Sequence, residues 1–321
     1  MPTVKILGVP HSYTLTEPAL AEPPSSEPVS SDQALVFIHG WLLSRAYWQP
    51  LVSQLAAHHR CLTYDLRGFG GSAQGSHADK QGRQAAKGSP PRQLKIPTGY
   101  SWTAPHSASA YSLAAYAQDL GELLDRLGLD QVWLLGHSLG GSIALWAAYL
   151  LPERVKGVIC INAGGGIYIP KEFEKFRSAG QQMVKYRPTW LPAVPLLPRL
   201  FSRLMVHQPL DTRWGRQRID DFIQADKQAA AGALLESTTC EAVHQLPQLI
   251  AQLKQPVHFI TASKDQVMPP RYVNYLASFH PHFQAGMSVS ELADCGHMAM
   301  VEQPEAVGEV VRVVLENGSR Q

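Results

Sequence analysis

The chain has 321 residues, of which 45% are hydrophobic, and its formal net charge at pH 7 is +2. A chain of this length can bury a large core and lies near the upper limit for one compact domain. The hydrophobic share is ordinary for a globular protein, and so small a charge, with no dominating basic stripe, argues against a nucleic-acid partner.

Cysteine spacing and apolar segments indicate the compartment. Cys61, Cys160, Cys240 and Cys295 are widely spaced and form no C-x-x-C pair, which favours core or incidental thiols over a metal site or a disulfide framework. The first residues lack the apolar stretch of a secretory signal, and no segment has the uninterrupted apolar length of a transmembrane helix. We therefore expect a cytoplasmic protein with no stable membrane insertion.

Short apolar runs alternate with segments of helical period through most of the chain. In chain order, the expected strands are 4–9, 11–16, 34–38, 60–64, 132–135, 155–161, 257–261 and 287–292. The expected helices are 46–58, 111–127, 142–150, 270–279 and 304–316. The first two strands are expected to pair as a hairpin, and the later alternation predicts an α/β fold with a mostly parallel sheet covered by helices on both faces.

Two polar loops interrupt the first half of this pattern. Residues 17–32 are rich in Pro, Ser and Glu and are expected to be exposed. Residues 74–110 are polar and lie between an expected strand and its following helix, and a loop of this length is functional or disordered. We expect a flexible insertion there, with a flap beside the active site as the alternative.

A longer interruption follows the strand at 155–161. From residue 166 to residue 245 the helix-like segments 171–186 and 216–236 are separated by a proline-rich stretch. This pattern predicts an inserted helical cap over 166–245. The rest of the chain, 1–165 and 246–321, is predicted to form the α/β core.

The segment Gly136-His137-Ser138-Leu139-Gly140-Gly141 carries a G-x-S-x-G motif between an expected strand and an expected helix. The flanking glycines allow the backbone to bend sharply, which leaves the Ser138 hydroxyl exposed at the tip of the turn. The following helix points its positive end at the place where negative charge develops in acyl transfer. This context predicts that Ser138 is a nucleophile.

A nucleophilic serine needs a histidine base and a carboxylate that orients it. His297 follows the last expected strand, at the edge of the sheet where Ser138 is also expected, so it is the preferred base. Asp265 directly follows a buried strand at that edge and is the preferred acid. Asp294 is the alternative, but it is only three residues from His297 and is badly placed to reach the far ring nitrogen.

The negative charge of a tetrahedral intermediate also needs hydrogen-bond donors. The backbone N–H of Leu139, which follows the nucleophile, is one expected donor, and the N–H of Trp41 in the loop after strand 34–38 is the other. His39 in that loop and His137 beside the serine are expected to brace the structure and not to act as bases.

Together these features resemble the α/β-hydrolase superfamily, and most closely its cap-bearing esterases, thioesterases and C–C hydrolases. The resemblance rests on the order Ser138, Asp265, His297, on a strand followed by His39-Gly40, and on the run Asp65-Leu66-Arg67-Gly68-Phe69-Gly70-Gly71-Ser72. It implies an eight-stranded sheet, a lid after the sixth strand and no cofactor. It also implies that Ser138 is the nucleophile, His297 the base and Asp265 the acid, with the amides of Trp41 and Leu139 as the oxyanion hole. A serine nucleophile argues against haloalkane dehalogenases and epoxide hydrolases, which use aspartate.

The expected function is therefore that of a cofactor-independent, metal-free serine hydrolase of a small-molecule ester or thioester. The apolar, proline-rich segment 188–198 would form a wall for an acyl chain or isoprenoid if it packs over the serine, or cap core if it does not, and a peripheral membrane contact is the third alternative. The arginines after it would meet an anionic substrate end or form a solvated face: Arg199, Arg203, Arg213, Arg216 and Arg218. The alternatives are a lyase or C–C bond hydrolase on the same triad, and a ligand-binding protein that retains the triad.

Overall fold

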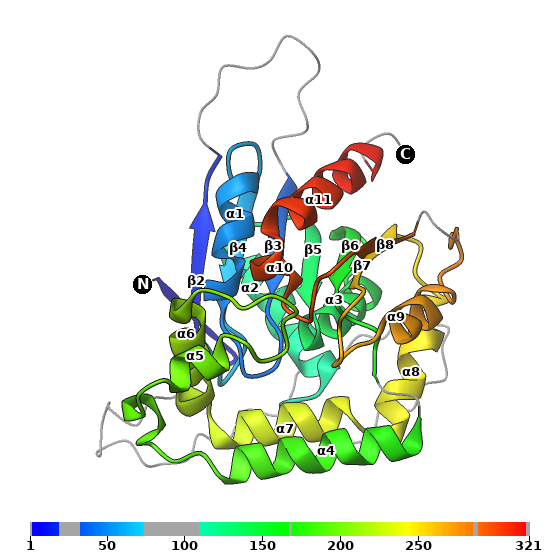
Figure 1. Ribbon diagram of the computed structural model, residues 1–321. Helices are drawn as coiled ribbons and strands as arrows, with labels where there is room; N and C mark the ends of the chain where they lie inside the picture. Colours follow the sequence, from blue (N-terminus) through cyan, green and yellow to red (C-terminus); the bar gives the residue numbers. More distant parts are fainter. Residues whose placement is uncertain (1, 19–32, 74–108, 167–168, 285–287, 319–321) are drawn as a thin grey trace.

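The computed structural model of the protein describes residues 2–18, 33–73, 109–166, 169–284 and 288–318. Within them one sheet forms from β1 (Thr3–Ile6), β2 (Val9–Thr16), β3 (Gln33–Ile38), β4 (Arg60–Tyr64), β5 (Gln131–His137), β6 (Val155–Ile161), β7 (Val257–Ala262) and β8 (Val289–Leu292). Its strand order is β1-β2-β4-β3-β5-β6-β7-β8 (Figure 1). The pairs β1–β2 and β2–β4 are antiparallel and the remaining neighbours are parallel. The predicted α/β class and mostly parallel eight-stranded sheet are confirmed.

The helices are the short 3-10 turns η1 (Arg45–Trp48), η2 (Gly70–Ser72) and η3 (Leu191–Ala193), and α1 (Gln49–Leu55), α2 (Leu113–Leu127), α3 (Leu139–Leu150), α4 (Pro170–Lys185), α5 (Leu197–Phe201), α6 (Thr212–Gln224), α7 (Lys227–Ser237), α8 (Cys240–Ile250), α9 (Pro270–Ala277), α10 (Ala299–Glu302) and α11 (Pro304–Gly318). None of the described helices is long and apolar enough to cross a membrane. Local signals set the ends of α2, because the Ser112 hydroxyl accepts the N–H of Ala115 at its start and Gly128 ends it with φ of 62°.

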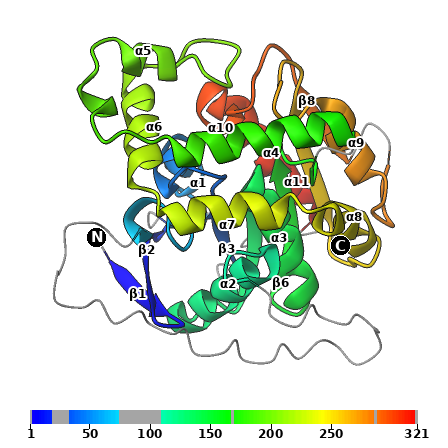
Figure 2. The same cartoon turned by 90° about the horizontal axis from the view of Figure 1, so that it is seen from below.

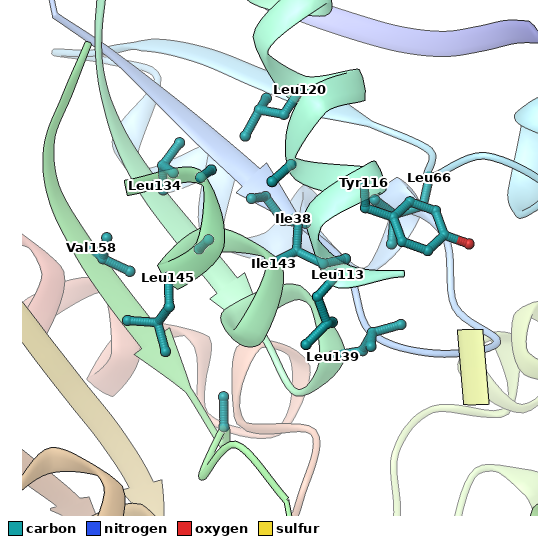
Figure 3. Close-up of a cluster of buried hydrophobic side chains, with 14 of the residues drawn as sticks. Ile38, Leu66, Leu113, Tyr116, Leu120, Leu134, Leu139, Ile143, Leu145 and Val158 are labelled. Carbon is teal, nitrogen blue, oxygen red and sulfur yellow. The ribbon is translucent and has the colours of Figure 1, made fainter. Parts of the chain in front are cut away.

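The central strands are apolar along their whole length because both of their faces are buried. In β3, Val36 and Ile38 belong to one core layer and Leu35 and Phe37 to the other. Side chains of α2, α3 and α9 cover the first layer, and side chains of α1, α10 and α11 cover the second. Figure 3 shows the first layer, where Ile38 meets residues of α2 and α3 such as Leu120 and Ile143.

The segment between β6 and β7, here called the β6–β7 insertion, holds α4 to α8. Figures 1 and 2 both show α4 and α7 side by side beyond the carboxyl ends of the strands, where they cover that edge of the sheet. The predicted helix 216–236 is two helices, α6 and α7, because the chain turns at Ala225-Asp226. The predicted end of the cap at residue 245 falls inside α8, which packs against α3 and α9 of the core.

The expected hairpin at the N-terminus is present as β1 and β2. The loop expected over 17–32 and the insertion expected over 74–110 lie almost wholly outside the described residues. The register aligns the carboxyl ends of the central strands, since Ile38 pairs with Gly136 and His137 pairs with Ile161. Residues that follow these strands therefore meet at one edge of the sheet.

Candidate active site

Ser138 stands at the turn between β5 and α3 with φ of 52° and ψ of −118°, a conformation that costs a non-glycine residue about 1–3 kcal/mol. The surrounding packing enforces this turn. A Cβ on Gly136 would lie 2.3 Å from the carbonyl oxygen of Gly140, and a Cβ on Gly140 would lie 2.1 Å from that of Ile38. The Ser138 N–H donates to the carbonyl of Ile161 in the neighbouring strand at 3.0 Å. The glycines of the motif thus let α3 approach the sheet and hold the hydroxyl outward.

Three side chains that are far apart in the sequence converge at this turn. The Ser138 hydroxyl lies 3.1 Å from Nε2 of His297, and Nδ1 of that ring lies 2.7 Å from Oδ2 of Asp265. His297 and Asp265 are buried, whereas Ser138 is partly exposed. A neutral ring that donates from Nδ1 to the carboxylate leaves Nε2 free to accept the serine proton, which is the arrangement that activates a serine.

Asp265 is held as an anion by four hydrogen bonds. Its Oδ1 accepts the N–H groups of Val267 and Met268 at 2.9 and 2.8 Å, and its Oδ2 accepts Nδ2 of Asn162 at 2.9 Å as well as His297. Burial raises the pKa of Asp265, but the charge and hydrogen bond of His297, with the Met268 and Asn162 bonds, outweigh it, and the pKa is lowered. The carboxylate is therefore ionised and fixed in orientation.

The backbone of His297 is fixed on both sides. Its N–H donates to the carbonyl of Met205 in the β6–β7 insertion at 2.8 Å, and its carbonyl lies 2.8 Å from Nε2 of His137. Glu302 strengthens this junction, because its two carboxylate oxygens accept the N–H groups of His207, Gln208 and Gly296 at 2.9, 2.9 and 3.0 Å. The insertion and the histidine loop are thus joined beside the site.

Ser138 opens into a cavity of about 90 Å³ between the sheet edge and the insertion. Among the described residues, its lining is mainly apolar and includes no charged side chain: Trp41, Ser138, Leu139, Ser142, Gly164, Gly165, Gly166, Phe176, Leu234, Ser237, Thr238, Val267 and Met268. The two residues predicted as oxyanion donors, Trp41 and Leu139, both line this cavity. Leu139 is the first residue of α3, so its N–H has no acceptor within the helix. The indole of Trp41 donates to the carbonyl of Ala230 at 2.8 Å and ties this loop to α7.

Two histidines beside the site are structural. The N–H of Leu66 donates to Nε2 of His39 at 2.9 Å, and Nδ1 of His39 donates to the carbonyl of Gly40 at 2.8 Å. Burial lowers the pKa of His39, and burial followed by the charge of His297 lowers the pKa of His137 to about 3. Both rings are therefore neutral at neutral pH, and they brace the backbone as the sequence analysis expects.

Asp294, the alternative acid, lies away from the ring nitrogen of His297 that Asp265 binds. Its side chain is exposed, and its Oδ1 lies 4.0 Å from Nζ of Lys264 and 3.9 Å from Nε2 of His207. Residues 188–198 contribute nothing to the lining of the cavity, so the expected apolar wall over the serine is absent there. The arginines expected as anion contacts are also absent from the lining, and Arg218 is buried with its guanidinium on the carbonyls of Phe201 and Leu204.

Asn162 and Glu302 are missing from the sequence analysis although both hold the site together. Asn162 directly follows β6, so a polar residue at the carboxyl end of a buried strand is the signal that could have identified it. Glu302 carries no such signal, because its partners come from the insertion. Among the described residues, no group of three or more His, Cys, Asp or Glu side chains is arranged to hold a metal ion.

The comparisons with known proteins agree with this architecture. The family model described as the alpha/beta hydrolase fold matches residues 33–304. The chain is 25% identical to the pimeloyl-[acyl-carrier protein] methyl ester esterase of Aliivibrio salmonicida, over 77% of this chain and 80% of that one. It is 24% identical to Lipase 1 of Psychrobacter immobilis, over 84% of this chain and 73% of that one.

A solved esterase from Thermogutta terrifontis superposes with a TM-score of 0.68 at 22% identity and covers 99% of this chain and 100% of its own. At that identity the structural likeness bears on the fold alone. The family match spans most of the sequence and includes every residue of the site described above. The chain therefore belongs to the alpha/beta hydrolase fold family.

Proposed function

We propose that the protein is a serine hydrolase that cleaves an ester or thioester with an apolar acyl portion. The observation that carries this proposal is the chain of contacts from the Ser138 hydroxyl through His297 to Asp265, at 3.1 and 2.7 Å, which opens into an apolar cavity. The relatives named as a methyl ester esterase and a lipase support ester chemistry. The proposed cycle uses only water and residues of this chain.

In the first half of the cycle, Ser138 Oγ attacks the substrate carbonyl carbon while its proton passes to Nε2 of His297. Asp265 stabilises the imidazolium that forms. The N–H groups of Leu139 and Trp41 donate hydrogen bonds to the oxyanion, and each of them lowers the barrier by about 3 kcal/mol. Collapse of the intermediate breaks the bond to the leaving oxygen or sulfur, which takes the proton from His297 and departs.

In the second half, water attacks the acyl-enzyme and gives one proton to His297. The second tetrahedral intermediate then expels Ser138 Oγ, which recovers that proton, and a carboxylic acid is released. Because the part of the cavity lining that the structure describes holds no charged side chain, an apolar acyl group fits it better than a charged one.

The test is hydrolysis of p-nitrophenyl esters and matched acyl thioesters by the wild type and by Ser138→Ala, His297→Ala and Asp265→Asn. We expect Ser138→Ala and His297→Ala to lower kcat by at least about ten thousandfold, and wild type to release a burst of nitrophenol from the acyl-enzyme. A fluorophosphonate should label Ser138 alone. The Ser142→Ala variant, which removes another hydroxyl of the same cavity, should still be labelled. Near wild-type turnover in Ser138→Ala would refute the proposal.

A further inference from the structure

The β6–β7 insertion exposes an unusual set of large apolar side chains. They lie within residues 183–205, here called the outer segment, and each is between 40% and 69% exposed: Met183, Tyr186, Trp190, Leu196, Leu200, Leu204 and Met205. The outer segment runs from the end of α4 through α5 at one end of the insertion (Figures 1 and 2). Large apolar side chains exposed together within one short segment indicate a contact with a partner or a lipid surface.

This exposure is built into the backbone. The guanidinium of Arg218 on α6 binds the carbonyls of Phe201 and Leu204, and a Cβ on Gly215 would lie 1.7 Å from the carbonyl oxygen of Pro198, so α5 is packed closely onto α6. Leu196 has φ of 69°, a left-handed conformation that is unfavourable for leucine and leaves its side chain the most exposed of the set. α5 is therefore fastened to α6, while Leu196, Leu200 and Leu204 in and beside it remain exposed.

The charges in and beside the outer segment have one sign. Between Glu174 and Asp211 the sequence has six cationic residues and no acidic one: Lys175, Arg177, Lys185, Arg187, Arg199 and Arg203. Arg177 and Arg187 bind backbone carbonyls of neighbouring helices. Arg199 and Arg203 are exposed on and beside α5, and in the described part of the chain neither forms an ion pair with an acidic side chain.

We propose that the outer segment docks on the surface of a bilayer with anionic headgroups. Leucines at the acyl boundary, a tryptophan and a tyrosine at headgroup level and arginines on lipid phosphates are the combination that interfacial segments use. A symmetric contact with a second copy is disfavoured, because it would bring two sets of unpaired arginines together. The segment does not line the cavity, so the apolar side chains are not explained by substrate binding.

The docking surface is connected to the candidate site by the backbone, because the carbonyl of Met205 accepts the N–H of His297. Docking would therefore place the cavity close to the lipid surface. Vesicle binding by the outer segment does not depend on the proposed ester hydrolysis. If either proposal fails, the other can still be tested.

The experiment is cosedimentation of the full chain with vesicles of phosphatidylcholine that contain about one third phosphatidylglycerol, at low salt, compared with pure phosphatidylcholine vesicles. We expect binding to the anionic vesicles that weakens as salt rises. Arg199→Gln with Arg203→Gln should weaken it roughly tenfold to thirtyfold. Leu196→Ser with Leu200→Ser should weaken it at least about tenfold. The emission of Trp190, taken as the difference between wild type and Trp190→Phe, should shift to the blue.

A matched control replaces one exposed cation and one exposed apolar residue of α11. This helix lies at the top of Figure 1, whereas the insertion lies at the bottom. Arg312→Gln with Val313→Ser should bind vesicles like wild type. Far-UV circular dichroism and urea unfolding of all variants report folding independently of the proposed hydrolysis, and none of the changed residues lines the cavity. Absence of binding to anionic vesicles, equal loss in the α11 control, or a dimer that forms through the outer segment would each overturn the proposal.

Discussion

One amide links two elements of the candidate site at the residue scale. Asn162 has φ of 50°, and its Nδ2 donates both to Oδ2 of Asp265 at 2.9 Å and towards the carbonyl of Gly296 at 3.4 Å. The same carboxylate oxygen accepts the His297 ring. Loss of the amide would therefore loosen both Asp265 and the loop that carries His297.

We expect Asn162→Gly to lower kcat about tenfold with little change in KM, because a hydrogen bond to a buried charge is worth about 1.5–3 kcal/mol. Glycine is the informative replacement, since it adopts the positive φ without the strain that alanine would add. Steady-state ester hydrolysis measures both constants. Asn162→Asp should be worse than Asn162→Gly, because it places a second carboxylate beside Asp265. Equal activity of wild type and Asn162→Gly would contradict a positioning role.

At the scale of elements, Glu302 joins the histidine loop to the insertion. It is the last residue of α10, and it accepts N–H groups from His207, Gln208 and Gly296. We expect Glu302→Ala to lower kcat about tenfold while KM changes little, because His297 would lose its fixed contact with Met205. Assays well below the unfolding temperature separate this effect from lost stability.

Glu302→Gln supplies the control for that joint. Its side-chain oxygen can still accept the two N–H groups of the insertion, whereas its amide group cannot accept the N–H of Gly296. It should therefore recover part of the activity lost in Glu302→Ala. If both variants behave like wild type, the joint has no part in positioning His297.

A buried carboxyl on α6 makes stability depend on pH. Burial raises the pKa of Asp221 to about 7, against hydrogen bonds from Ser44 and Gln217 that lower it, while the charge of Asp65 raises it further. Ser44 lies in the loop after β3, so the group connects the insertion to the core. Because the folded state holds this proton more tightly than the unfolded chain, it binds more protons between about pH 4 and pH 7, and the free energy of unfolding falls as pH rises through that window.

Asp221→Asn should remove this fall. We expect the free energy of unfolding of the variant to rise relative to that of wild type from about pH 4 to pH 7. Above pH 7 the variant should be the more stable protein, by at most about 4 kcal/mol. Urea unfolding at a series of pH values measures the difference. Asp220→Asn changes the exposed neighbour on the same helix and should leave the pH dependence as in wild type. If the free energy of unfolding depends on pH in the same way in Asp221→Asn and in wild type, the raised pKa of Asp221 is refuted.

The sheet and the placement of Ser138, Asp265 and His297 could be predicted because they depend on local signals. Ser138 and Asp265 follow short apolar strands and His297 follows the last strand, and parallel strands bring their carboxyl ends to one edge. Asn162 carries a similar signal, since it directly follows β6, but its contacts with Asp265 and Gly296 could not be predicted from the sequence. Glu302 and Asp221 carry no local signal, because each joins the β6–β7 insertion to the core, and no periodicity encodes how the insertion packs.

At the level of the whole molecule, the insertion bears on the alternatives that the sequence leaves open for residues 188–198. Residues 188–198 are apolar and proline-rich, and composition alone does not decide which surface of such a segment faces inward. In the structure Trp190 and Leu196 face solvent, and Phe176 of α4 and Leu234 of α7 are the residues of the insertion's helices whose apolar side chains line the cavity. The cavity thus lies between two layers, the sheet edge and the insertion.

The width of the cavity therefore depends on how closely the insertion packs against the edge of the sheet. Leu234 is buried, it lines the cavity beside Ser138, and its side chain would lie 2.6 Å from a Cβ placed on Gly180 of α4. Truncation of this leucine should widen the cavity where α4 and α7 meet over the site. We expect Leu234→Ala to raise kcat/KM for long-chain relative to short-chain p-nitrophenyl esters about tenfold, since each methylene accommodated contributes about 0.8 kcal/mol.

Leu249 of α8 is a matched buried leucine that does not line the cavity. Both Leu234→Ala and Leu249→Ala should lower the free energy of unfolding by about 2–5 kcal/mol, because each leaves a void in a packed layer. Only Leu234→Ala should change the order of preference among acyl lengths, measured as kcat/KM across an ester series at a temperature where both variants are folded. If the two variants shift the preference equally, the meeting of α4 and α7 does not select the acyl group, and the width of the site is controlled by the sheet edge alone.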